Sequence, residues 1–395
     1  MPLSELPGAG GWPAPLTPMR VAGPAPGAPG SPSSEAVQPF GVYVHVPFCA
    51  RRCDYCAFAT WTDRHHLMAS YTEACVVELD GAALAPATSV FFGGGTPSLL
   101  PPERLAAVLD AVPRSPQAEV TVECNPEDAT AARLDAYRGA GVTRLSFGVQ
   151  STDPSVLVNL GRNHGPGSVA GAVAAAAEAG FGDRYSVDLI YGAAGETPES
   201  WRRTLESVLA FDPPPAHVSA YALTVEPGTP LSAAAGRHPD SDDQADKYIT
   251  TEAVLADHGL DWYEISNWAR PGAECRHNQL YWAQGTYRGI GCAAHSHGPA
   301  GGGRFRRWWN VRTPQRYQRA VAEGRSPVAA GEVLEAGTRR LEGLQLGLRT
   351  RAGVPSPALD DDPLLDGLVE RRGGRAVLTV RGRLLANEVA MRLTA

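Results

Sequence analysis

Three cysteines, Cys49, Cys53 and Cys56, stand close together in the segment VHVPFCARRCDYCAF. Their C-x3-C-x2-C spacing places three thiolates on one loop, directly after an apolar run. Iron–sulfur cubanes are held by cysteine thiolates, usually four. With three ligands, one iron stays uncovered and can chelate the amino and carboxylate groups of S-adenosylmethionine. The spacing therefore predicts a 4Fe–4S cluster with an open iron.

Other uses of these thiols are less consistent with the sequence. A structural zinc site needs a fourth ligand, and His45 or Cys75 would not give a standard zinc-finger spacing. Three inert buried thiols are disfavoured at such close spacing. A remote fourth cluster ligand would have to come from one of four other cysteines, for which a role as a small buried hydrophobe is favoured: Cys75, Cys124, Cys275 and Cys292.

Glycines and polar residues recur at the ends of the apolar runs. In FFGGGTPS, residues 91–98, three glycines allow close backbone approach and positive φ. Carboxylate, amide and guanidinium groups there suit the ribose, ammonium and carboxylate groups of S-adenosylmethionine. For each residue alone, a capping or core hydrogen bond is the alternative. The residues that we expect on one rim are Glu123, Gln150, Arg162, Asp188, Tyr221 and Ala222.

The elements that must position these residues follow a strand–helix alternation from Phe40 onward. Strands are predicted over residues 41–46, 88–92, 119–123, 143–147, 185–190 and 217–223, with a seventh short strand open over 261–265. Helices are predicted over 63–81, 101–112, 129–140, 166–180 and 198–211. The pattern predicts an α/β fold, a partial (β/α)6 barrel with right-handed crossovers. Sites in such folds form at the C-terminal strand ends.

Composition divides the chain into three parts. Residues 1–38 are rich in Pro, Gly, Ala and Ser, which predicts a disordered tail. Residues 39–270 carry the alternation, and residues 271–395 are predicted as a C-terminal domain. Its end, with helices over 334–348 and 363–371 followed by RAVLTVRG and LLANEVAMRL, indicates a small α+β winged-helix-like unit. That unit either binds DNA or, as favoured, packs against the barrel.

The charge balance argues against bulk nucleic-acid binding, because the net charge is -7 and charged residues are 19% of the chain. Hydrophobic residues are 43%, which suffices for a large core. No apolar run reaches membrane-spanning length, and no secretory signal is visible. Seven cysteines without a regular framework are typical of metal or catalytic use in a reducing cytoplasm.

With these motifs in view, YVHVPFCARRCDYC, GGGTPS, SFGVQS, DLIYG and LTVRGRLLANEV resemble oxygen-independent coproporphyrinogen III oxidase and its relatives in the radical S-adenosylmethionine family. The resemblance covers roughly residues 40–395. It implies the cluster on Cys49, Cys53 and Cys56. It further implies that ten residues contact S-adenosylmethionine: Tyr43, Tyr55, Gly94, Gly95, Thr96, Glu123, Gln150, Arg162, Asp188 and Ala222.

Two features favour the heme chaperone branch (HemW type) of that family. The oxidases carry a further cysteine two residues after the third ligand, where this chain has Phe58. The chain also has an H-N-x-x-Y-W motif, formed by His277, Asn278, Tyr281 and Trp282, which resembles that branch and implies heme contacts. An imidazole can ligate iron, and aromatic rings can cover a porphyrin face. Taken without the resemblance, these residues would be a core cluster; His295 and His297 are weaker candidates.

The resemblance therefore implies a heme-trafficking chaperone with a 4Fe–4S cluster, S-adenosylmethionine and heme. Its expected partners are apo-hemoproteins and an electron donor such as flavodoxin or ferredoxin, with a homodimer left open and nucleic acid not expected. The alternative is oxidative decarboxylation of coproporphyrinogen III or another radical reaction on a tetrapyrrole. A third class is a DNA-binding regulator that uses a basic patch in the C-terminal unit: Arg371, Arg372, Arg375, Arg381 and Arg383.

Overall fold

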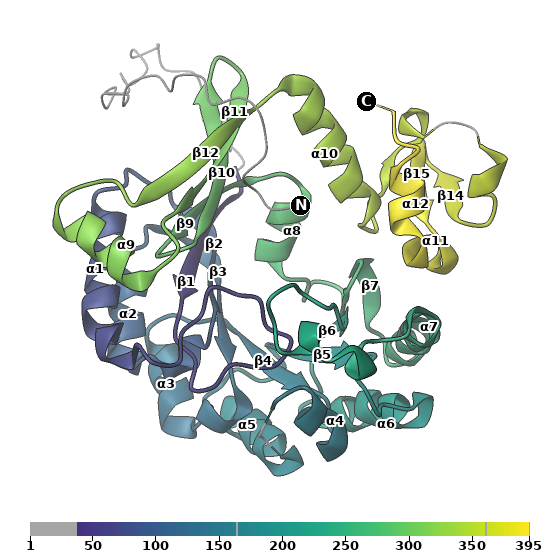
Figure 1. Ribbon diagram of the computed structural model, residues 1–395, viewed down its shortest axis with the longest axis horizontal. Coiled ribbons are helices and arrows are strands. Elements are labelled where there is room, and N and C mark those ends of the chain that lie inside the picture. Colours follow the sequence, from purple (N-terminus) through teal and green to yellow (C-terminus); the bar gives the residue numbers. More distant parts are fainter. Residues whose placement is uncertain (1–37, 163–164, 360–361, 395) are drawn as a thin grey trace. The chain divides into compact units, whose positions relative to one another are not determined.

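Six parallel strands in chain order form the centre of the sheet in this computed structural model, which describes residues 38–162, 165–359 and 362–394 (Figure 1). The predicted tail over residues 1–38 lies outside the described residues, apart from Gln38. The strands are β1 (Phe40–Val46), β2 (Ala87–Gly94), β3 (Arg114–Cys124), β4 (Arg144–Gln150), β5 (Tyr185–Tyr191) and β6 (His217–Ala222).

Helices connect these strands and cover one face of the sheet. Asp153 caps α4 by accepting from Ser155 N, and Thr197 and Ser200 form a capping box at α6. The five helices predicted from the pattern are present with shorter bounds, and two more, α4 and α7, accompany them. The helices are α1 (Met68–Asp80), α2 (Pro102–Asp110), α3 (Ala131–Gly139), α4 (Pro154–Asn159), α5 (Pro166–Glu178), α6 (Pro198–Leu209) and α7 (Ser241–Asp257).

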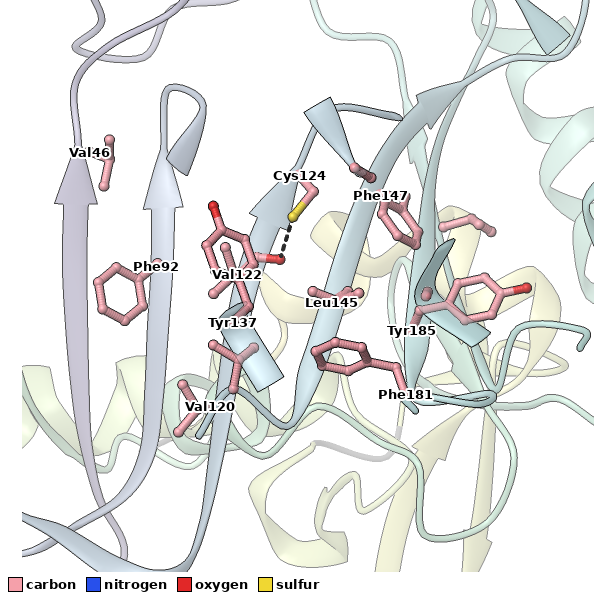
Figure 2. Close-up of a cluster of buried hydrophobic side chains, with 14 of the residues drawn as sticks. Val46, Phe92, Val120, Val122, Cys124, Tyr137, Leu145, Phe147, Phe181 and Tyr185 are labelled. Carbon is pink, nitrogen blue, oxygen red and sulfur yellow. Dashed lines mark hydrogen bonds between the residues drawn. The ribbon is translucent and has the colours of Figure 1, made fainter. Parts of the chain in front are cut away.

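The core lies between these helices and the sheet. Figure 2 shows Tyr137 of α3 and Phe181, which follows α5, against residues of the neighbouring strands β3 and β4. Each fully buried side chain of this size contributes about 1.5–3 kcal/mol. Because both faces of the central strands are buried, their sequences read as continuous apolar runs. The side chains in this layer include Val120, Val122, Leu145, Phe147, Phe181 and Tyr185.

The sheet continues beyond the six parallel strands on both sides, and its order is β12-β11-β10-β9-β1-β2-β3-β4-β5-β6-β8-β7. Strand β9 (Thr286–Ile290) pairs in parallel with β1, and β10 (His295–Gly301), β11 (Arg304–Asn310) and β12 (Val328–Leu334) follow antiparallel. At the other edge, β7 (Asp261–Glu264) and β8 (Asn267–Ala269) run antiparallel. The two outermost strands, β12 and β7, are not neighbours in this order, so the sheet is not closed. This confirms the predicted partial barrel.

This sheet crosses the predicted boundary at residues 270 and 271, because β9 lies beside β1. Residues 39–395 form one compact unit. The division into 39–270 and 271–395 stays a prediction. Helices α8 (Arg276–Trp282) and α9 (Pro314–Ala322) also lie beyond residue 270. No helix within the described residues is long and apolar enough to cross a membrane.

The C-terminal unit has its own apolar core, which includes Leu348, Val354, Leu378 and Val389. Its sheet has the order β13-β15-β14, and the small α+β character predicted for this end is confirmed. The elements are α10 (Ala336–Leu348), β13 (Val354–Pro355), β14 (Val369–Arg372), β15 (Arg375–Leu378), α11 (Val380–Leu384) and α12 (Ala386–Ala390).

The helix predicted over residues 363–371 is wrong. A 3-10 turn, Pro363–Leu365, is followed by β14, which pairs with β15 as a hairpin. The cause is the Gly373–Gly374 pair, whose φ angles of 57° and 75° close a two-residue turn between Arg372 and Arg375. The apolar periodicity was compatible with a helix, and the turn chemistry decided the structure.

Candidate functional site

The cysteine loop begins where β1 ends and is fastened by backbone hydrogen bonds on two sides. Cys49 N donates to Trp61 O at 3.1 Å, and Thr96 N donates to Phe48 O at 2.8 Å. Since β1 and β2 are neighbours in register, the loops that follow them meet at the same edge of the sheet. The glycine turn after β2 therefore lies directly beside the cysteine loop.

Gly95 makes the closest approach between these two loops. A Cβ atom there would lie 2.7 Å from Phe48 O, 2.8 Å from Val46 O and 3.0 Å from Cys49 Sγ. Two of these atoms are backbone oxygens, which cannot turn aside. Thr96 Oγ1 also donates to Cys49 Sγ at 3.7 Å. A residue without a side chain is required at position 95 for the first cysteine to sit where it does.

The three cysteines lie on this one loop, within eight residues of one another. Cys49 is 8% exposed, and Cys53 and Cys56 are half-buried. Burial raises the pKa of the Cys49 and Cys56 thiols, and the neighbouring thiols raise it further. Within the described ranges, no three His, Cys, Asp or Glu side chains are already arranged as a metal-ligating group. The loop thus holds three soft donors beside a backbone cradle, and these donors fit an iron–sulfur cluster.

Arg162 links the second cysteine to the strand ends. Its Nη1 donates to Cys53 Sγ at 3.6 Å, and its Nη2 donates to Gly148 O at 2.8 Å and Asn125 Oδ1 at 2.9 Å. Its Nε is buried without a hydrogen-bond partner among the described residues. The guanidinium therefore holds one more donor for an acceptor at this rim, such as a carboxylate.

Glu123 stands at the middle of the rim. Its Oε2 accepts from Gly94 N at 3.1 Å. A Cβ at Gly93 would lie 3.1 Å from both Glu123 Oε1 and the Tyr43 ring, so these two side chains flank the glycine. Burial, and then the nearby Asp188 carboxylate, raise the pKa of Glu123 to about 8.

The remaining rim residues extend from this centre along β4, β5 and β6. Asp188 Oδ2 accepts from Ser146 Oγ at 2.8 Å, and burial raises its pKa. Gln150 has a φ of 64°, and a Cβ at Gly148 would lie 3.0 Å from Gln150 Nε2. Ala222 lies exposed at the end of β6.

Tyr55 lies on the cysteine loop itself, and the pKa of its phenol is raised by burial and by Cys53. Nearby, Asp54 pairs with Arg237 at 2.9 Å, and Leu231 N donates to Asp54 O at 3.0 Å. No motif indicated this ion pair, because 183 residues separate its members. Asn125, which orients Arg162, is a second residue that the motifs did not indicate.

The H-N-x-x-Y-W motif forms α8, and its histidine is an interior residue. His277 is 1% exposed; its Nδ1 is hydrogen-bonded to Ser89 Oγ at 2.9 Å and its Nε2 to Tyr281 Oη at 2.8 Å. The ring stacks on Phe91 with centroids 5.4 Å apart. Burial lowers the pKa of His277 to about 3, so the imidazole is neutral with both nitrogens engaged.

The four motif side chains are divided among three cavities. His277 and Asn278 line one of about 210 Å³ with Asp188. Tyr281 lines this one and a cavity of about 660 Å³. Trp282 lines a third, of about 440 Å³. The structure therefore brings the strand-end residues together, whereas it separates Trp282 from the other three motif residues.

Comparison with known proteins places this geometry in a family. A model of the radical SAM superfamily matches residues 43–208. The heme chaperone HemW of Mycobacterium tuberculosis H37Rv is 42% identical over 381 residues, which cover 90% of this chain and 95% of that protein. The chain belongs to the HemW family. A mitochondrial radical S-adenosyl methionine domain-containing protein 1 from Bos taurus is 38% identical over 351 residues, 83% of this chain and 77% of that protein.

A solved structure resembles this HemW-family chain over most of its length. It is coproporphyrinogen III oxidase (HemN) from Escherichia coli, described as a radical SAM enzyme. It has a TM-score of 0.76 and 24% identity, and the match covers 90% of this chain and 89% of that one. At this identity the likeness establishes the fold alone. The fold and family predicted from the motifs are thus confirmed.

A cavity of about 660 Å³ in this HemW-family chain opens from the rim. Tyr43, Gly94 and Glu123 line it, as do residues 57–59 of the cysteine loop. The opposite wall comes from β10, β11, β12 and α10, elements that lie more than 230 residues beyond the cysteines. The cavity adjoins the residues predicted to contact S-adenosylmethionine. Its opposite wall comes from the part of the chain that follows the six predicted strands.

Proposed function

We propose that this protein is a heme chaperone that binds heme, carries a 4Fe–4S cluster with S-adenosylmethionine, and delivers the heme to apo-hemoproteins. The observation that carries this proposal is the breadth of the match to relatives named heme chaperone HemW, which spans 95% of one of them. Phe58 at the position of the oxidases' additional cysteine supports the same assignment.

The proposed cluster ligands are Cys49, Cys53 and Cys56. Their support is the donor set on one loop, the Gly95 cradle against Cys49 Sγ and the Arg162 contact to Cys53 Sγ. When bound, a reduced cluster supplies one electron to a sulfonium. Metal binding requires deprotonated thiolates, and the Arg162 guanidinium lies 3.6 Å from Cys53 Sγ.

The proposed S-adenosylmethionine site is the rim around Glu123. There the glycine turn offers backbone groups, Arg162 offers the unpaired Nε, and Glu123 and Asp188 offer acceptors. A carboxylate beside a buried cationic ligand loses part of its desolvation cost, so binding favours ionised Glu123. The proposed contacts are Tyr43, Tyr55, Gly94, Gly95, Thr96, Glu123, Gln150, Arg162, Asp188 and Ala222.

The alternative function, oxidation of coproporphyrinogen III, shares this machinery. We infer that the protein lacks it, because Phe58 replaces a thiol with an apolar ring that is 65% exposed. Flavodoxin or ferredoxin is the proposed electron donor, and the cytoplasm the proposed location. The homodimer stays a prediction.

DNA binding is not supported by the arginines of the C-terminal unit. Arg371 donates to Ser356 O at 2.8 Å, Arg375 donates to Ala352 O at 3.0 Å, and Arg383 pairs with Glu252 at 2.7 Å. These contacts tie the guanidiniums to carbonyls and a carboxylate of the protein itself, although Arg371 and Arg375 are exposed, and the net charge of -7 argues against bulk DNA binding. The packing role expected for this unit is therefore the one that we propose.

The test uses the full chain, reconstituted anaerobically with iron and sulfide. We expect about four irons per chain and saturable binding of hemin. With reductant, S-adenosylmethionine and coproporphyrinogen III, we expect no protoporphyrinogen, while Escherichia coli coproporphyrinogen III oxidase in the same assay forms it. Product formation, or hemin binding without saturation, overturns the chaperone assignment. Cys53→Ala should lose the iron, and the control Cys75→Ala, a buried thiol in the core, should keep it.

A further inference from the structure

The cavity of about 660 Å³ beside the cysteine loop has the size and wall chemistry of a ligand site (Figure 1 shows the elements around it). Ligand pockets commonly measure about 300–1,000 Å³ and combine apolar walls with a few polar groups. Here Phe58 contributes an apolar ring from the cysteine loop, and Leu334 and Leu346 contribute apolar side chains from the opposite wall. A flat apolar molecule fits such a wall.

Three histidines line this cavity, and the ring nitrogens of two of them, His45 and His297, already make hydrogen bonds. His45 bonds Tyr43 Oη through Nδ1 at 3.1 Å and Ala59 O through Nε2 at 2.9 Å. His297 bonds Gly285 O through Nδ1 at 2.9 Å and is 7% exposed. The ligating capacity of both rings is thus restricted by hydrogen bonding or burial.

His295 differs from both. Its side chain is exposed, and neither ring nitrogen has a hydrogen-bond partner among the described residues. Its ring stacks on Trp309 with centroids 5.6 Å apart and planes 25° apart. Stacking fixes the orientation of the imidazole while leaving its nitrogens available, which is the arrangement that an axial iron ligand needs.

The cavity wall also contains a cation without an ion pair. Arg307 is held by Glu342 at 3.2 Å and by Glu332 at 2.5 Å. Arg312, which follows β11, is exposed and has no ion-pair or hydrogen-bond partner in the part of the chain that the structure describes. A guanidinium in that state can bind a carboxylate in a bidentate fork.

We propose that this cavity is the heme site, with His295 as the axial ligand of the iron and Arg312 as the partner of a heme propionate. This inference rests on the proposed function and specifies its site. A ring nitrogen of His295 donates its lone pair to the iron, and Phe58 contacts the porphyrin face. His277, whose nitrogens bond Ser89 and Tyr281, is then a structural residue of the wall behind.

The experiment titrates ferric hemin into the full, cluster-loaded chain and follows the Soret band and the resonance Raman signature of an iron–imidazole bond. For His295→Ala we expect at least tenfold weaker binding and loss of that signature, with recovery on adding free imidazole. The matched control is the exposed His66→Ala, which should behave like the wild type. A wild-type signature in His295→Ala overturns the ligand assignment while the chaperone function stands. Failure of the wild type to bind hemin overturns both.

A second variant tests the propionate contact independently of the iron ligand. Arg312→Gln should weaken hemin binding about three- to tenfold and leave hemin dimethyl ester, which lacks the carboxylates, unaffected. The control Arg304→Gln removes an exposed guanidinium on the same sheet that does not line the cavity. Equal losses for hemin and its ester in Arg312→Gln would overturn the carboxylate contact.

Discussion

The strand-end rim and the motif helix α8 organise their functional residues in opposite ways. On the rim, residues far apart in sequence meet: Gly94 N bonds Glu123 across 29 positions, and Arg162 bonds Cys53 across 109. On α8, His277 and Trp282 are five positions apart yet line different cavities. Residues that are close in the sequence therefore do not always line the same site, and residues of one site can be far apart in the sequence.

The geometry of the two elements explains this difference. Parallel strands all end at one edge of a sheet, so residues that follow them converge whatever their separation. A helix turns by about 100° per residue. Residues His277 and Tyr281, four apart, therefore share a face and bond each other, whereas Trp282, five positions after His277, lines a different cavity. A contiguous motif on one helix is in part a packing motif.

The largest expected loss of stability comes from a substitution in the motif helix α8. His277→Ala removes the partner of both Ser89 Oγ and Tyr281 Oη inside the protein and leaves a cavity. We expect a loss of about 3–5 kcal/mol in the free energy of unfolding, measured by urea denaturation, with the iron–imidazole signature of bound hemin retained in the folded fraction. Small destabilisation together with loss of that signature would make α8 a heme-binding element instead.

The next largest expected effect is a dependence of stability on pH. It arises at Glu264, which lines a cavity together with Trp282 of α8. Burial raises the pKa of Glu264 to about 7, against hydrogen bonds from Ser266, Asn267 and Trp282 that lower it. The folded state therefore holds this proton more tightly than the unfolded state, whose ordinary pKa is 4.5. The stabilisation is full below pH 4.5 and is lost as the pH rises to about 7.

At about 1.4 kcal/mol per pH unit, this carboxyl accounts for about 3 kcal/mol across that window. Glu264→Gln keeps the shape and removes the titration, so the free energy of unfolding should fall less between pH 5 and pH 7 than in the wild type. The exposed Glu370→Gln is the control. Parallel pH curves for Glu264→Gln and the wild type would mean that Glu264 stays ionised in the fold.

Much of the rim was predictable from the sequence, because buried parallel strands leave apolar runs and their ends are marked by Gly94, Glu123 and Gln150. Contacts between distant segments were not. Nothing in the sequence pairs His277 with Ser89, 188 positions away, or places His295 opposite Phe58. These contacts depend on the pairing of β9 with β1 in the sheet. No local sequence pattern indicates which strand β9 pairs with.

The smallest expected loss of stability comes from a substitution on the rim, at Gly95. Gly95→Ala puts a Cβ within 3.0 Å of Cys49 Sγ and against two backbone oxygens, so the cysteine loop must shift. Overpacking of this kind costs about 1–3 kcal/mol. The protein should stay folded, but because Cys49 is displaced relative to Cys53 and Cys56, iron per chain after reconstitution should fall at least fivefold.

Gly139→Ala is the matched control, because a Cβ there meets nothing within 4 Å and the residue ends helix α3. It should keep its iron and be as stable as the wild type or slightly more so. If Gly95→Ala binds iron as well as Gly139→Ala does, the cysteine loop tolerates displacement from the glycine turn. The rim would then resemble α8, where neighbouring residues serve separate sites, and the contrast between the two regions would disappear.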